Sequence, residues 1–305
     1  MATTLLQLVQ QSAAEMGLAI PNTVAGNTAT DVTQMYYLIN AAGNELAREY
    51  PWEAMNTEYD WYSQYSQSDG AIVYGTSVIT GVDPATVAFI NAAGATNFQV
   101  QGEGVIQSTQ VVSALGTTVT INSAATSDGS GNYVFGQVMY DLPAGFDRIT
   151  DRTQYDKSKR WEMLGPETAQ QWQWLKSSYI STGPRIRWRI MGQKFQIWPL
   201  TSTNEYLSFE YISANWAASA AGAGQTQFIQ DSDTCIFPNR LMVLALKKKY
   251  FEVKGFDTSS FQRDYDMQLN IAKANDAGSA TLSLAPRVAN VLIGWENIPD
   301  ANYGA

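Results

Sequence analysis

The first fifty residues show apolar positions at helical spacing. After Thr3 and Thr4 they recur every three or four residues until Gly17, and a second such run lies between Thr30 or Asp31 and Pro51. A threonine can cap a helix start, whereas glycine and proline end helices. The pattern therefore predicts two amphipathic helices. Their apolar faces carry Leu5, Leu8, Val9, Ala13 and Met16 in the first, and Val32, Met35, Tyr36, Ile39, Leu46 and Tyr50 in the second.

From Gly70 to Gly136 the pattern changes to short alternating runs separated by turns, after an extended aromatic stretch from Thr57 to Gln67. Val, Thr, Ser, Ala and Gly dominate this segment, which contains no Lys or Arg. Short, closely spaced strands without a helical pattern favour a small β-sandwich or barrel. Because the segment is internal, we expect both of its ends to connect to the helical part. The predicted strands are Ser77–Gly81, Ala88–Ile90, Asn97–Val100, Thr109–Ala114 and Thr117–Asn122.

The rest of the chain mixes strands and helices. Alternation predicts strands at Tyr133–Leu142 and Tyr206–Ile212, and a hairpin of Ile186–Met191 with Lys194–Pro199 around Gly192. Helical spacing predicts helices at Pro166–Tyr179, Arg240–Lys254 and Phe261–Gly278. The fold class is α+β: a helical bundle with an antiparallel sheet, an inserted all-β domain and an extended C-terminal arm. The predicted domains are a core of helices and a hairpin sheet at residues 1–69 and 133–278, the insertion 70–136 and the arm 279–305.

The composition argues against most kinds of active site. The chain has no histidine and one cysteine, Cys235, which excludes Ser-His-Asp and Cys-His nucleophiles, the usual zinc sites and an intrachain disulfide. No phosphate-binding glycine motif occurs. We therefore predict no enzyme, cofactor or metal site. Carboxylate chemistry stays open, but the candidate acids lie among Arg148, Arg152 and Arg160, which would pair with them. These acids are Asp147, Asp151, Asp156, Glu162 and Glu167.

Charge is divided unevenly along the sequence. Residues 1–147 contain one basic residue, Arg48, against 13 acidic ones, whereas residues 148–305 contain 18 basic and 15 acidic residues. This division predicts an acidic and a mildly basic pole, which would suit head-to-tail association. The alternative is a β-rich insertion that is simply poor in Lys and Arg.

Two segments are candidate interfaces. Arg185, Arg187 and Arg189 alternate with apolar residues, so a strand would place three guanidinium groups on one face. This stripe could meet DNA phosphates or acidic groups of a neighbouring subunit, or it could be a solvated strand face. In the arm, the residues Val291, Leu292 and Trp295 are apolar enough to predict docking on a partner.

The N-terminus lacks the basic region of a secretory signal, since the first Lys or Arg is Arg48. The apolar run Leu241–Leu246 is too short to span a membrane. We expect a soluble protein made in a cytoplasm, with no membrane partner.

The order of these elements, together with several short segments, resembles the head-to-tail adaptor proteins of tailed bacteriophages, also called tail tubular protein A in short-tailed phages. The resemblance covers about residues 1–68 and 133–278. It rests on Arg48-Glu-Tyr-Pro-Trp52, on Tyr140-Asp-Leu-Pro-Ala-Gly-Phe-Asp-Arg148, on the hairpin Arg187–Pro199, on the segment Leu207–Trp216 and on the closing helices from Phe237 to Gly278.

The resemblance implies a structural protein of the virion neck. Family members form a ring, usually of about twelve subunits, between the portal protein and a tail tube or nozzle, and DNA passes through its lumen. The insertion Gly70–Gly136 departs from the minimal family pattern, and we expect it to face outward, towards fibres or neighbouring virion proteins. The arm would contact the portal or an adjacent adaptor.

Two other functions stay open. A virion component that binds carbohydrate would use its tryptophans and its β-domain to hold host sugars, and it would form no ring. A carboxylate glycosidase would lose hydrolysis when one acid is replaced.

Overall fold

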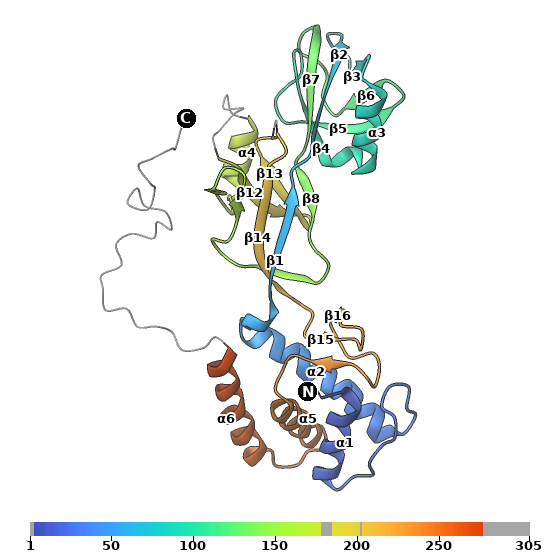
Figure 1. Cartoon of the computed structure of the whole chain (residues 1–305), viewed down its shortest axis with the longest axis vertical. Helices are drawn as coiled ribbons and strands as arrows, with labels where there is room; N and C mark the ends of the chain where they lie inside the picture. The colour runs from blue at the N-terminus through green and yellow to red at the C-terminus, as the bar shows by residue number, and fades with distance from the viewer. Residues whose placement is uncertain (1–2, 178–184, 202, 277–305) are drawn as a thin grey trace, which may run out of the picture.

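The computed structural model describes residues 3–177, 185–201 and 203–276. Its parts are arranged along one long axis (Figure 1). Helices near the two ends of the sequence form one end, two antiparallel sheets form the middle, and a six-stranded barrel forms the other end. The predicted mixture of helices with antiparallel sheets and an inserted β-domain is confirmed.

Four helices form the helical end: α1 (Leu5–Met16), α2 (Thr30–Glu49), α5 (Asn239–Val253) and α6 (Ser259–Asp276). Helix α5 lies among the other three, and all its side chains from Leu241 to Lys247 are buried. As predicted, Thr4 caps α1, and Gly17 ends it in the left-handed conformation (φ 69°). For α1, local capping and tertiary burial therefore agree on where the helix lies.

Trp216 lies at the centre of this end and is fully buried. Its ring lies 4.9 Å from the ring of Phe228 and its indole N–H donates to Asn44 Oδ1 at 2.9 Å. A side chain at Gly43 of α2 would collide with this indole. Trp216 precedes a small sheet that joins the helices to the rest of the chain. Its strands are β15 (Ala217–Ala218), β16 (Gly224–Gln225) and β17 (Thr234–Cys235).

Ion pairs join acidic side chains of the two N-terminal helices to basic side chains near the C-terminal helices. Glu15 of α1 lies 2.8 Å from Arg240 and 2.9 Å from Lys247, both of α5. On α2, Glu45 pairs with Lys249 at 2.6 Å. The same arrangement holds for two further pairs, Asp31 with Lys254 and Glu49 with Lys273. The predicted acidic and basic poles are therefore wrong for this end of the molecule, because the two charge-rich segments fold onto each other.

Glu15 should make stability depend on pH. Its burial raises its pKa, but hydrogen bonds from Lys247, Gln11 and Arg240 outweigh burial and lower the pKa to about 2 from 4.5. A carboxylate with a lowered folded pKa stabilises the fold above its unfolded pKa, and this stabilisation is lost as pH falls. We expect about 1 kcal/mol, reduced by solvent screening, to be lost between about pH 4.5 and pH 2.

Urea unfolding across this pH range measures the effect, with Glu15→Gln as the matched variant. The difference in unfolding free energy between the two proteins should shrink as pH falls. A difference that stays constant from pH 6 to pH 2 would contradict this assignment.

The middle of the molecule consists of two sheets packed face to face. One has the strand order β1 (Asn56–Tyr62), β14 (Tyr206–Ser213), β10 (Tyr155–Asp156) and β11 (Trp161–Glu162), and β9 (Phe146–Ile149) also pairs with β14. The other has the order β12 (Arg187–Met191), β13 (Lys194–Trp198) and β8 (Met139–Asp141). The predicted hairpin is confirmed as β12 and β13.

An aromatic core fills the space between these sheets. The ring of Phe195 lies 5.4 Å from that of Trp188 and 5.1 Å from that of Phe209, and both pairs are stacked. The indole of Trp61 packs edge-on against Phe195. Helix α4 (Ala169–Ser177) lies between β11 and β12 in the sequence. Its Trp172 and Leu175 cluster with Trp198 of β13. Alternation along the strands directs these rings inward.

The barrel closes in the order β2-β3-β6-β5-β4-β7. Its core consists of buried side chains that include Ile79, Phe98 and Phe135. The strands are β2 (Tyr65–Ile72), β3 (Val78–Thr80), β4 (Phe98–Gln101), β5 (Thr109–Leu115), β6 (Thr118–Ile121) and β7 (Gly129–Gln137). Short 3-10 turns at Glu53–Met55 (η1) and Ala95–Asn97 (η2) precede β1 and β4.

Three expectations about the barrel are wrong. Ala88–Ile90 is not a strand but part of α3 (Pro84–Ala92), because Pro84 starts a helix whose Thr86, Val87 and Ile90 are buried. The barrel also connects to the central strands β1 and β8 rather than to helices, and its first strand begins before Gly70. Its first and last strands meet where the Gln137 N–H donates to the Gln64 carbonyl at 2.8 Å.

Candidate functional site

The arginine stripe lies on β12 and just before it. Its alternation is as predicted, since Ile186 and Trp188 are buried while Arg185 is exposed and Arg187 and Arg189 are partly exposed. The Arg187 guanidinium forms an ion pair at 2.5 Å with Glu167, whose side chain is only 8% exposed. The central charge of the stripe is therefore balanced within the chain, before any partner binds.

Arg185 and Arg189 are the other two charges of the stripe. Neither forms an ion pair with a carboxylate in the described ranges. Burial lowers the pKa of Lys176 on α4, and the positive charge of Arg189 lowers it further. Arg189 and Lys176 thus make a local excess of positive charge, which an anionic partner would relieve. The candidate interface stays a prediction, and within the described ranges two of its three guanidinium groups have no carboxylate partner.

The remaining candidates, Val291, Leu292 and Trp295, lie outside the described residues, as does the arm 279–305 that contains them.

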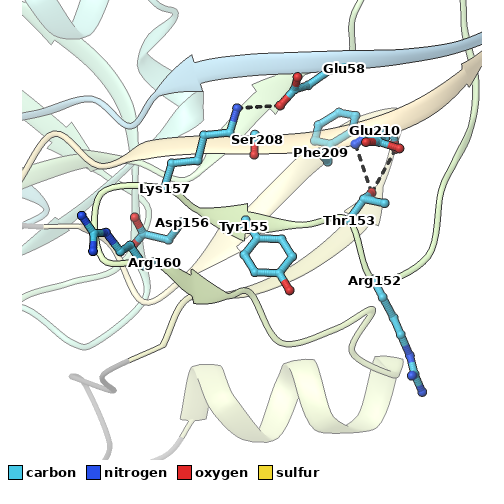
Figure 2. A pocket seen from close by; sticks show the side chains of 10 residues that line it. All are labelled: Glu58, Arg152, Thr153, Tyr155, Asp156, Lys157, Arg160, Ser208, Phe209 and Glu210. Carbon is cyan, nitrogen blue, oxygen red and sulfur yellow. Dashed lines mark hydrogen bonds and ion pairs between the residues drawn. The ribbon is translucent and has the colours of Figure 1, made fainter. Parts of the chain in front are cut away.

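A pocket of about 440 Å³ opens on the outer face of the β1-β14-β10 sheet (Figure 2). The aromatic core lies mainly on the other face, but Phe209 belongs to that core and also lines the pocket. Acidic and basic side chains line it together with Tyr155 and Thr153. The full lining is Glu58, Arg152, Thr153, Tyr155, Asp156, Lys157, Arg160, Ser208, Phe209 and Glu210.

Several charged side chains around this pocket have partners, and the pocket lining holds three acidic and three basic residues. The Lys157 ammonium lies 2.6 Å from Glu58 and 2.7 Å from Asp60, and these hydrogen bonds raise the pKa of Lys157. Glu210 accepts a hydrogen bond from Asn56 Nδ2 at 2.8 Å. Burial raises the pKa of Asp156, although its carboxylate accepts the Lys159 backbone N–H. A pocket with internally balanced charge suits a neutral polar ligand or a neighbouring protein surface better than a free ion.

The five acids considered for glycoside hydrolysis do not gather at one site. Only Asp156 lines the pocket, whereas Glu167 lies beside the other sheet with Arg187, and Asp147 has its neighbour Arg148 at 3.9 Å. The negative charge of Glu205 raises the pKa of Asp156 further. Glu205 itself is buried and pairs with Lys159 at 2.7 Å. Sequence spacing could not reveal this neighbour, because Glu205 lies directly before β14, far from Asp156 in the sequence.

Sequence reasoning also missed the outer face of β1. There Glu58, Asp60 and Tyr62 alternate with the inward Tyr59 and Trp61, a pattern that could have been detected. Tyr62 stacks on Tyr206, with ring centroids 4.8 Å apart.

Other chemistry is limited in the described part of the chain. Residues there include no group of three or more His, Cys, Asp or Glu that could hold a metal ion. Burial raises the pKa of the Cys235 thiol to about 12, so it stays protonated and unreactive. No described helix has both the length and the apolar character needed to cross a membrane.

Comparison with protein-family models and with curated proteins gives no match for this chain.

Proposed function

We propose that this chain is a structural head-to-tail adaptor of a tailed bacteriophage. It would form a ring under the portal, join the capsid to the tail and let DNA pass. The observation that carries the proposal is the order of the elements in space. The two N-terminal helices and the last helix, α6, pack around α5 at one end, and the two central sheets and the barrel extend away from that end (Figure 1).

This order suits a ring subunit for a physical reason. In a ring each subunit needs two different lateral surfaces, one for each neighbour. The helical end would offer several helix faces for these contacts at the same distance from the ring axis. In this proposal the helices are the bundle around the channel, the sheets face the portal or tail components, and the barrel lies farthest out. The barrel contains no Lys or Arg, so its contacts would be with proteins rather than with DNA.

A second function is supported by the sheet pocket. Neutral sugars are bound by polar groups beside aromatic rings, and the pocket combines Tyr155 and Ser208 with balanced charges. A receptor-binding tail component would use this pocket as a monomer. Glycan binding by the purified chain, abolished by Tyr155→Ala, would favour this function over the adaptor.

Negative-stain imaging of the chain mixed with its portal protein tests the adaptor. We expect a ring docked on the portal, and we expect Arg185→Glu/Arg189→Glu to weaken docking at least about tenfold, since charged interface pairs contribute more than about 1.4 kcal/mol. The variant's thermal unfolding midpoint should stay unchanged. A chain that remains monomeric in the presence of the portal would contradict the proposal.

A further inference from the structure

Strand β1 lies at the edge of its sheet and pairs only with β14 among the described strands. The direction of its backbone groups follows from β14. The Glu210 N–H donates to Thr153 Oγ1 at 3.0 Å and its carbonyl accepts the Thr150 N–H at 2.9 Å. The backbone N–H and C=O groups of Glu210 therefore point away from β1. The direction of the backbone N–H and C=O groups alternates from residue to residue along a strand. The backbone groups of Leu207, Phe209 and Tyr211 therefore point towards β1.

The register then shows which groups of β1 are free. Tyr59 and Trp61 lie opposite Phe209 and Leu207, so they bond to β14. Glu58, Asp60 and Tyr62 direct their N–H and carbonyl groups to the other side. No hydrogen bond joins these backbone groups to another described element, and all three residues are exposed. The result is an open strand edge about 23 Å long, from the rise per residue of a strand.

Open edges of this length attract further strands. A second copy of β1 fits poorly, because antiparallel pairing would bring Glu58 and Asp60 of both copies together. Lys157 supplies one positive charge against these two carboxylates. The edge therefore favours a strand without acidic residues.

The C-terminal sequence contains a candidate for this role. Val288-Ala-Asn-Val-Leu-Ile-Gly-Trp295 is rich in strand-forming residues, contains no acid and follows Arg287. The chain also leaves α6 close to β1. Asp276, its last described residue, accepts the backbone N–H groups of Glu53 at 2.5 Å and Ala54 at 3.3 Å, in the turn directly before β1. The linker 277–287 can span about 36 Å, more than the length of the edge.

We propose that Val288–Trp295 of the same chain pairs with the free edge of β1 through the backbone groups of Glu58, Asp60 and Tyr62. A short tether gives the segment an effective concentration on the order of millimolar at this edge. This inference concerns the single chain and goes beyond the adaptor role.

Residue-resolved hydrogen exchange on the whole chain tests the pairing. The amides of Glu58, Asp60 and Tyr62 should exchange at least about tenfold more slowly in the native chain than in Val291→Pro, which cannot complete the added strand. The amides of Tyr59 and Trp61, which bond to β14, should not change. Equal exchange at Glu58, Asp60 and Tyr62 in the two proteins would overturn the proposal.

Disulfide trapping tests whether the segment belongs to the same chain. In a Cys235→Ser background, Glu58→Cys with Val291→Cys or with Leu292→Cys should oxidise to an intramolecular disulfide at low micromolar concentration. The control pair Leu115→Cys with Val291→Cys places one thiol on the exposed turn of the barrel and should not react. Only disulfide-linked dimers, or equal reaction of the control, would overturn the same-chain assignment. Neither test depends on portal binding, so the adaptor proposal can fail separately.

Discussion

Replacing Trp216 by alanine should lower the free energy of unfolding by about 3–5 kcal/mol, the largest effect expected from one substitution in this chain. The indole is fully buried against Phe228, Phe237 and Gly43. Its removal leaves a cavity that the surrounding helices cannot fill, and it leaves Asn44 without its hydrogen-bond donor. Urea or thermal unfolding measures the loss.

Trp174→Ala is the matched control for this prediction. Trp174 lies on α4 with 58% of its surface exposed, and its replacement should change stability by less than about 0.5 kcal/mol. Equal losses for the two tryptophans would mean that Trp216 does not organise the helical end as the structure indicates.

The second large effect is expected at Arg187. Arg187→Ala leaves the buried carboxylate of Glu167 without its cation. Removing one partner of a buried ion pair costs about 3–5 kcal/mol, and we expect about 2 kcal/mol here because Arg187 is partly exposed. The urea midpoint should fall, whereas Arg189→Ala should leave it nearly unchanged.

A double replacement separates charge from packing at this site. Arg187→Ala/Glu167→Gln removes the unpaired charge, so it should recover part of the stability lost in Arg187→Ala. If the double variant is no more stable than Arg187→Ala, the loss does not come from an unpaired Glu167 carboxylate, and the Arg187 side chain stabilises the fold mainly by packing.

Local signals predicted much of the fold. Thr4 and Gly17 delimit α1, and Pro51 lies just past α2, because caps and breakers act within a few residues. Alternation around Gly192 predicted the β12–β13 hairpin for the same reason. The helix α3 was missed because its composition of Ala, Thr, Val and Ile is also that of a strand, although Pro84 marked its start. Strands of two residues, such as β10, carry no periodicity.

The candidate site depended on contacts that local patterns do not encode. Arg187 looked like one of three free charges until the fold brought Glu167 to it from another element. The division of charge along the sequence suggested two poles, but Glu15 and Lys247 lie 232 residues apart and still meet. Such pairings follow from topology, which composition cannot provide. The outer face of β1 became a candidate surface only once its neighbours were known.

The packing of α5 among α1, α2 and α6 affects how the chain is synthesised. The apolar faces of α1 and α2 emerge first, yet the helix that covers them begins at Asn239. The barrel, by contrast, closes within the consecutive residues Tyr65–Gln137 and can fold on emerging from the ribosome. A nascent chain therefore carries a complete barrel and two uncovered helices while the residues between Gln137 and Asn239 are being translated. During that interval, the helical end is the part most in need of a chaperone.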